Sequence, residues 1–331
     1  MKQTVIMGMP YFIQKEGENF RAPYGSVKLF QTLFQKRRTP RELTECLMSE
    51  YLSVAEKIKE MGYAMKILSC LPELQTLIED SLKIECVKIG KDFPHPLYPR
   101  DAWVSVPGTD MLIIPGCMPE GAFIFADANV KRLVNRFGEG GKVFLAGDYF
   151  ITTRITDGDD PLQFTGLVES RKHLPKLDKK FILLQNPFVV EQIKGGPKGY
   201  MPETHVDRFM TVVVDKRGET HVLLDPDIYA GWKHPLQKPT ITVEQSLRMM
   251  KDTLKSSGIY HIHIPRRLCN PYGLGAVQFG DGRVLMTSEE PHVEAILQAI
   301  LGTDAVFTTS VPIVHYGALF RAGVRCLVNE I

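Results

Sequence analysis

This sequence has neither a marked excess of charge of one sign nor a long run of apolar residues. Its 40 lysines and arginines nearly balance 38 acidic residues, for a formal net charge of +2, whereas nucleic-acid binders concentrate basic residues in a patch. No apolar run is long enough to span a bilayer, and the first residues, MKQTVIMGMPYF, lack the apolar stretch and cleavage site of a signal peptide. We therefore expect a cytoplasmic protein that binds neither nucleic acid nor a membrane.

The six cysteines lack the paired CxxC spacing of common metal sites and the regular spacing of a disulfide framework. Because the chain is also too long to need covalent staples, we expect all six to be reduced thiols. Cys326 is unusual because it lies just before the end of the chain. Chain ends usually fray, so packing alone does not account for a thiol at this position.

What the sequence does contain is enough apolar material for a sizeable core, with 44% hydrophobic residues. Apolar residues at three- and four-residue spacing, followed by a glycine, predict three helices, and capping boxes mark the starts of the first two. An apolar run typical of a strand follows each helix. These three helix-then-strand units cover residues 39–70, 242–265 and 293–314.

Between these units lie pairs of short apolar runs joined by turn residues, which predict β-hairpins. No linker or low-complexity segment separates hairpins from helices. We therefore expect a single α/β domain over residues 1–331, built from repeated hairpin-plus-helix modules. The expected hairpins cover residues 102–116, 142–153, 210–225 and 276–287.

Polar residues that could do chemistry collect at the starts of these hairpins. Asp101 and Glu139 each precede an apolar run, and His205 and Asp207 are two residues apart, which on a strand would place them on one face. Each alone has an ordinary explanation as a surface ion pair, a turn residue or a core histidine. Together with Cys326 they form a set of one thiol, one imidazole and three carboxylates.

Four short motifs resemble those of the guanidino-modifying enzymes, the pentein superfamily that includes arginine deiminases, dimethylarginine hydrolases, agmatine deiminases and amidinotransferases. The resemblance runs from residue 99 to the end of the chain, and the motifs occur in the family's order. It implies a five-bladed α/β propeller with pseudo-fivefold symmetry around a central site. The motifs are PRDAWV at 99–104, EGGKVF at 139–144, THVDRF at 204–209 and AGVRCLVNE at 322–330.

The resemblance also implies roles for individual residues. Cys326 would be the nucleophile that attacks the guanidinium carbon, and His205 would act as general acid and then general base. Glu139 would orient His205 or share the substrate cation, while Asp101 and Asp207 would bind the guanidinium N–H groups. Such chemistry needs no metal or other cofactor. We therefore expect a hydrolase that cleaves a C–N bond of arginine or an arginine-like small molecule through a covalent thiouronium intermediate.

The far end of the substrate is less well defined by the sequence. Arg154 lies roughly where relatives place an arginine that binds the substrate carboxylate, whereas agmatine, which ends in an amine, would need a carboxylate or an apolar wall. Arginine, a methylated arginine and agmatine all stay open as substrates. So does the formation of a homo-oligomer.

Several alternatives accompany the hydrolase hypothesis. An amidinotransferase would use the same cysteine, and a non-catalytic binding protein could have the same propeller. His315 competes with His205 as the base, although the His-x-Asp context favours His205. Lys142 stands where the family often has an aspartate, and residues 261–263, HIH, are expected to form a structural strand rather than a metal site.

Overall fold

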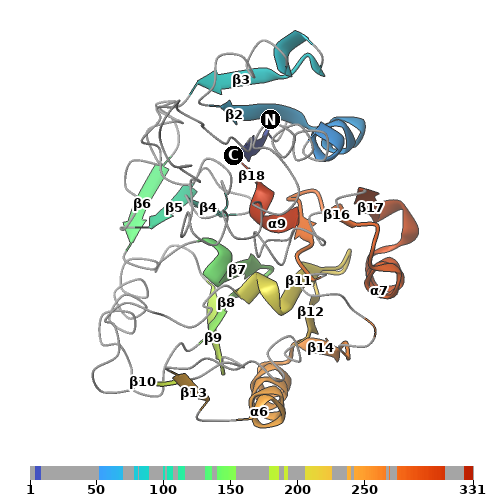
Figure 1. The fold of residues 1–331 in the computed structure, drawn as a ribbon. Coiled ribbons are helices and arrows are strands. Elements are labelled where there is room, and N and C mark those ends of the chain that lie inside the picture. Colours follow the sequence, from blue (N-terminus) through green and yellow to red (C-terminus); the bar gives the residue numbers. More distant parts are fainter. Residues whose placement is uncertain are drawn as a thin grey trace, which may run out of the picture.

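A computed structural model gives the fold of the chain (Figure 1). Within the residues that it describes, the chain forms several small mixed sheets, three longer helices and separate buried cores. The described residues are 4–8, 52–69, 78–80, 82–88, 100, 103–106, 111–115, 131–135, 140–153, 179–185, 190–192, 206–225, 237–239, 242–265, 268, 274–309 and 324–330.

Four sheets have the same strand order, in which an antiparallel hairpin is followed by a strand that pairs in parallel with its second strand. These hairpins confirm the four predicted from the sequence. A two-stranded sheet also pairs β10 (Val190–Gln192) with β13 (Gln237–Pro239). The four sheets are β4 (Val104–Ser105), β5 (Met111–Pro115) and β6 (Lys131–Asn135); β7 (Val143–Ala146), β8 (Tyr149–Thr153) and β9 (Lys180–Leu184); β11 (Met210–Val214), β12 (Thr220–Leu224) and β14 (Tyr260–His263); and β15 (Val277–Gln278), β16 (Val284–Thr287) and β17 (Val306–Thr309).

A further sheet repeats this order with strands from both ends of the chain. β18 (Val328–Glu330) pairs antiparallel with β1 (Thr4–Gly8), and β1 pairs in parallel with β2 (Ala64–Ser69). A fourth strand, β3 (Glu85–Lys88), pairs in parallel with β2. The two ends therefore lie side by side (Figure 1). This pairing holds β18, the strand that directly follows the segment with Cys326, in a sheet, so this segment does not fray as an ordinary terminus would.

Local turn chemistry explains the hairpins. In the β11–β12 turn, the Asp215 carboxylate accepts hydrogen bonds from the backbone N–H groups of Arg217 and Glu219, both at 2.9 Å. Gly218 has φ of +83°, a left-handed conformation that glycine adopts at low cost. Asp215, Arg217 and Gly218 thus specify the turn through interactions within the turn itself.

The helices precede the third strands of their sheets, as expected for parallel crossovers. Helix α6 (Val243–Ser256) has the predicted capping box: the Gln245 backbone N–H donates to Thr242 Oγ1 (3.1 Å), and the Thr242 N–H donates to Gln245 Oε1 (2.8 Å). Helix α7 (Pro291–Leu301) has proline at its first turn and ends before Gly302, and a third helix covers residues 52–60. The cap predicted for this third helix at residues 39–42 lies outside the described residues.

Apolar helix faces build the cores against the sheets. Val54 and Ile58 pack with Ile67 of β2, while Met250 and Leu254 of α6 pack with residues of the β7 and β11 sheets. All five side chains are fully buried. Truncating such a residue to alanine typically costs about 2–5 kcal/mol of stability, so these contacts hold each helix on its sheet.

In each of these five sheets we call the first strand in the order the first strand: β18, β4, β7, β11 and β15. Side chains join the first strands of neighbouring sheets. Asn329 Nδ2 of β18 donates to the Trp103 carbonyl oxygen (2.8 Å), and Trp103 Nε1 donates to the Glu330 carbonyl oxygen (3.1 Å). Val104 of β4 shares an apolar cluster with Val143 of β7. The last segment of the chain is thus linked through β4 to β7.

The links continue on the other side. Strand β7 contacts β11, and the Gln278 side-chain amide of β15 bonds both backbone groups of Val214 in β11, at 2.7 and 2.8 Å. The backbone N–H of Gly280, after β15, donates to Glu330 Oε1 at 3.1 Å. Each first strand therefore contacts or bonds the next, from β18 through β4, β7, β11 and β15 back to the residue that ends β18.

Candidate active site

The structure describes only part of the predicted site. Asp207 is described completely and is buried, and Cys326 lies in the short helix α9 (Val324–Leu327), where only its backbone is described. Four predicted site residues lie outside the described part of the chain: Asp101, Glu139, Arg154 and His205. The competing base, His315, lies outside it as well. Each of the four motifs nevertheless contains described residues, and these show where the motifs lie.

The first two motifs are in direct contact. Gly140, at the start of the 3-10 helix η2 (Gly140–Lys142), lies so close to the backbone of Arg100 that a Cβ atom on it would be 2.0 Å from the Arg100 carbonyl oxygen. It would also be 3.1 Å from the Trp103 carbonyl oxygen. Only glycine permits this approach, so Gly140 brings the Glu-Gly-Gly segment against the Arg-Asp segment.

The second and third motifs also meet. Helix η2 contacts the 3-10 helix η3 (Val206–Arg208), which contains Asp207 and directly precedes β11. Val206 and Phe209 on either side of Asp207 are fully buried. This apolar surrounding anchors η3 and fixes the position of its one carboxylate.

The fourth motif reaches the second and third through Arg325, the residue before Cys326. Arg325 Nη1 donates to Asp207 Oδ2 at 2.9 Å, and Nη2 donates to the Val143 carbonyl oxygen at 2.7 Å. Its guanidinium lies over the Phe144 ring, 3.9 Å from the centroid. The side chains of Arg325 and Asp207 are only 6% and 1% exposed. The four segments that carry the predicted site residues therefore converge.

Arg325 is the residue that sequence reasoning missed. Asp207 was expected to bind the guanidinium of a substrate, and in the structure it binds a guanidinium of the chain itself. A usable signal existed in the segment AGVRCLV, where one charged residue interrupts a small apolar run. A charge in such a run is rarely buried without a partner, and an acidic residue elsewhere is the natural partner.

A cavity of about 560 Å³ lies along the first strands. Phe144, Val212 and Val277 contribute to its wall, and Arg325 lines it as well. It extends to hairpin-turn residues such as Lys216 and Gly282, at the ends of the strands away from the motifs. Arg100, Phe144 and Arg325, which belong to three of the four motif segments, all line this cavity.

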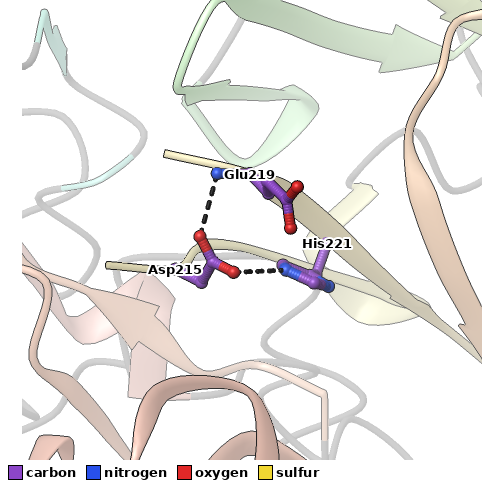
Figure 2. Close-up of side chains that lie close together, drawn as sticks. All are labelled: Asp215, Glu219 and His221. Carbon is purple, nitrogen blue, oxygen red and sulfur yellow. Dashed lines mark hydrogen bonds and ion pairs between the residues drawn. The ribbon is translucent and has the colours of Figure 1, made fainter. Parts of the chain in front are cut away.

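One cluster has the composition of a metal site. Asp215, Glu219 and His221 each offer a ligand atom, all within 4.8 Å of one another (Figure 2). The guanidinium of Arg217, however, already pairs with Asp215 Oδ2 (3.1 Å) and Glu219 Oε2 (2.5 Å). His221 Nε2 is 3.3 Å from the same Asp215 oxygen. The cluster is satisfied by Arg217, so we interpret it as part of the hairpin turn.

The pKa of Asp215 reflects this network. Partial desolvation acts to raise the pKa, but hydrogen bonds from the backbone N–H groups of Glu219 and Arg217 and from the side chains of His221 and Arg217 hold it well below its usual range. The carboxylate is therefore ionised at any ordinary pH.

Other predictions from the sequence have clear outcomes. Residues 261–263 lie in β14, which confirms the predicted strand, and His261 Nδ1 lies 3.3 Å from the Ile259 carbonyl oxygen. Cys86 is a free, buried thiol, and burial, followed by the nearby Glu79 carboxylate, raises its pKa to about 11. Among the described residues, no helix has the length and apolar character needed to cross a membrane.

The fold is similar to those of known guanidino-modifying enzymes. The agmatine deiminase of C. jejuni matches with a TM-score of 0.61 and 13% identity, over 99% of this chain and 92% of that one. The N-terminal domain of ArgZ, a cyanobacterial arginine dihydrolase, matches with a TM-score of 0.53 and 12% identity, over 99% and 97%. The inosamine-phosphate amidinotransferase of Streptomyces griseus matches with a TM-score of 0.54 and 11% identity, over 99% and 93%.

The sequence itself has no comparable match. No protein-family model matches it, and neither does any curated protein sequence. At 11–13% identity, the structural likeness establishes the fold alone. The chain has the α/β fold of the pentein enzymes, as expected from the resemblance of its four motifs.

Proposed function

We propose that this chain is a hydrolase that cleaves a C–N bond of a guanidino compound, with Cys326 as its nucleophile. The observation that supports this most is the convergence of four motif segments that are scattered from residue 99 to residue 330. Gly140 packs on the Arg100 backbone, and Arg325 bonds both Asp207 and Val143. A structural scaffold alone would not require a thiol, an imidazole and three carboxylates in these segments.

The proposal includes a closed five-bladed α/β propeller with pseudo-fivefold symmetry, formed by one domain over residues 1–331. Two features support it: the repeated strand order of five sheets, and the succession of contacts from β18 through β4, β7, β11 and β15 to the end of β18. In such a propeller, all four motifs lie at the same end of the first strands.

The first half of the reaction forms a covalent intermediate. The Cys326 thiolate attacks the guanidinium carbon, which is poorly electrophilic because resonance spreads its charge, so precise holding of the planar cation matters. Asp101 and Asp207 hold its N–H groups. His205 protonates the departing nitrogen as the C–N bond breaks, leaving a thiouronium on Cys326 and releasing ammonia or an amine.

The second half releases the product. His205, now neutral, takes a proton from water, and the oxygen attacks the thiouronium carbon. As the C–S bond breaks, the hydroxyl of the tetrahedral adduct loses its proton to solvent and becomes the carbonyl of a urea-type product, and the thiolate of Cys326 is restored. Glu139 orients His205 through both halves, as the third residue of a catalytic triad does.

The substrate class depends on which residue binds the end of the substrate away from its guanidino group. If Arg154 faces the bound molecule, its guanidinium would pair with an α-carboxylate and favour arginine or a methylated arginine. Agmatine has no carboxylate and would gain nothing from Arg154. Kinetics with arginine and agmatine on the wild type and Arg154→Gln therefore decide between the two classes.

Amidino transfer is the second candidate, since an amidinotransferase is among the proteins of similar fold. In that case an amine rather than water would attack the thiouronium. A mass-spectrometric screen of guanidino compounds, each with and without an amine acceptor, separates the two. We expect ammonia, an alkylamine or urea as products without an acceptor, and no turnover of any compound would favour a non-catalytic protein.

Replacing Cys326 with serine tests the nucleophile. We expect Cys326→Ser to abolish turnover, because a hydroxyl is a far poorer nucleophile near neutral pH. A cationic haloacetamidine should label Cys326 much faster than neutral iodoacetamide does, because the surrounding carboxylates attract the cation, and a guanidino substrate should protect it. Cys86 is the internal control, since its buried thiol with a raised pKa should react slowly with both reagents. Retained turnover in Cys326→Ser would refute covalent catalysis here.

A further inference from the structure

The reaction proposed above assigns no role to the buried guanidinium of Arg325. Arg325 directly precedes Cys326, and its guanidinium is held by Asp207, by the Val143 carbonyl oxygen and by the face of Phe144. An uncharged side chain at position 325 would be enough for ordinary packing against Val143 and Phe144. Burying an arginine requires desolvation that only good partners offset, so its presence beside the nucleophile asks for an explanation.

We propose that Arg325 is a positioning residue that sets the Asp207 carboxylate for the guanidinium of the substrate. This inference rests on the proposed function and extends it to a residue that does not itself react. Through Asp207, Arg325 acts on substrate binding. Because Arg325 precedes Cys326 in α9, its bonds also hold the Cys326 backbone in place relative to η3 and β7.

The hydrogen-bond geometry shows how Arg325 holds the Asp207 carboxylate. An ionised carboxylate has about four acceptor positions on its two oxygens. Arg325 Nη1 takes one of them, on Oδ2, while Nη2 is directed to Val143 instead of forming a second bond to Asp207. Arg325 therefore restrains the rotation of the carboxylate plane through a single bond to one of its oxygens.

The identity of the side chain matters for the same reason. A planar guanidinium can donate in two fixed directions and also stack on an aromatic ring. Arg325 makes all three interactions at once: with Asp207, with Val143 and with the Phe144 ring. A lysine at position 325 would keep the charge and could reach Asp207, but it could not reproduce the stacked fork. Arg325→Lys should therefore retain part of the effect.

Arg325 is better explained as a permanent support than as a gate that leaves when the substrate enters. Its side chain is 6% exposed, and its backbone N–H donates to the Gly275 carbonyl oxygen at 2.7 Å. Displacement would have to break the bonds to Asp207 and Val143 together. A gate and a support predict opposite effects of removing Arg325, so kinetics separate them.

The test is a double-variant cycle measured per active site. The variants are Arg325→Gln, Arg325→Lys, Asp207→Asn and the combinations with Asp207→Asn, with the exposed Arg217→Gln as matched control. Active sites are counted by labelling with the cationic haloacetamidine before kcat and KM are measured with a guanidino compound that the wild type turns over. Counting sites removes the effect of any misfolded fraction.

If Arg325 positions Asp207, Arg325→Gln lowers kcat/KM per active site about 100-fold, mainly through a higher KM, and Arg325→Lys lowers it about 10-fold. In the Asp207→Asn background, either change at Arg325 costs no more than about 3-fold further, because the two residues act as a unit. Arg217→Gln stays at the wild-type value. If Arg325→Gln does not fold, the Arg325→Lys cycle gives the same comparison.

Three results would overturn the inference. Unchanged kcat/KM per active site in Arg325→Gln would mean that Arg325 only stabilises the fold. A higher kcat/KM would mean that it blocks the site. Independent, multiplying effects of Arg325 and Asp207 would mean that it does not act through this carboxylate. A wild type that turns over no guanidino compound would instead refute the proposed function, and this inference would fall with it.

Discussion

Two arginine–aspartate pairs in this molecule have similar distances and very different surroundings. Arg325 lies 2.9 Å from Asp207, with side chains 6% and 1% exposed, where the motif segments converge. Arg217 lies 3.1 Å from Asp215 in a hairpin turn, and its side chain is 73% exposed. The contact geometry is nearly the same, so the difference in environment decides what each pair contributes.

The environments differ in solvent screening and in sequence distance. Water screens the Arg217 charge, and its pair is local, two residues apart. The other pair is out of water and joins residues 118 positions apart. The first pair can only shape a turn, whereas the second holds distant segments of the chain together.

The largest expected difference is in stability. Arg325→Ala leaves the buried Asp207 carboxylate without this partner, which should cost about 3–5 kcal/mol. Arg217→Ala removes an exposed charge and should leave the midpoint of denaturant unfolding nearly unchanged. Urea unfolding of both variants, followed by circular dichroism, checks this. Equal losses would show that burial does not distinguish the pairs.

Two glycines extend the comparison from side chains to the backbone. Gly140→Ala places a methyl group against the Arg100 carbonyl oxygen, where the motif segments converge. It should lower the free energy of unfolding by about 1–3 kcal/mol and also lower the activity per active site. Gly218→Ala, in the hairpin turn, meets no atom within 4 Å but must adopt φ of +83°. It should cost about 1–2 kcal/mol and leave activity per site intact. Thermal melting with parallel turnover assays separates the two effects, and intact activity in Gly140→Ala would contradict the placement of the site.

The smallest expected effect is the pH dependence of the turn. The folded-state pKa of Asp215 lies below its unfolded value of 3.8, so its ionised form stabilises the fold above about pH 4. This stabilisation is lost as the pH falls through the lower, folded value. The stability difference between wild type and Asp215→Asn should therefore be full at pH 6 and shrink at pH 3, as measured by urea unfolding at both pH values. A difference that is the same at both would show that the charge of Asp215 does not matter.

Local features of the fold were predictable from the sequence because their causes are local. The Thr242 and Gln245 capping box, the turn residues of the four hairpins and the strand at 261–263 all depend on neighbours a few positions away. The predicted convergence of the site needed a resemblance as well, since no periodicity brings residue 99 near residue 326. The described parts of the four motifs meet, while the roles of Asp101, Glu139, Arg154 and His205 stay predictions.

By itself, the sequence determined the hairpins, the capping box of α6 and the four motifs that mark where chemistry could occur. Only the tertiary structure decided that β18 pairs with β1 and that Arg325 pairs with Asp207. Such pairings depend on closing loops of a hundred residues or more, and many acidic residues in the sequence could have served as a partner for Arg325. Burial selects Asp207, because the buried guanidinium of Arg325 needs a partner and the packed segments bring this carboxylate to it.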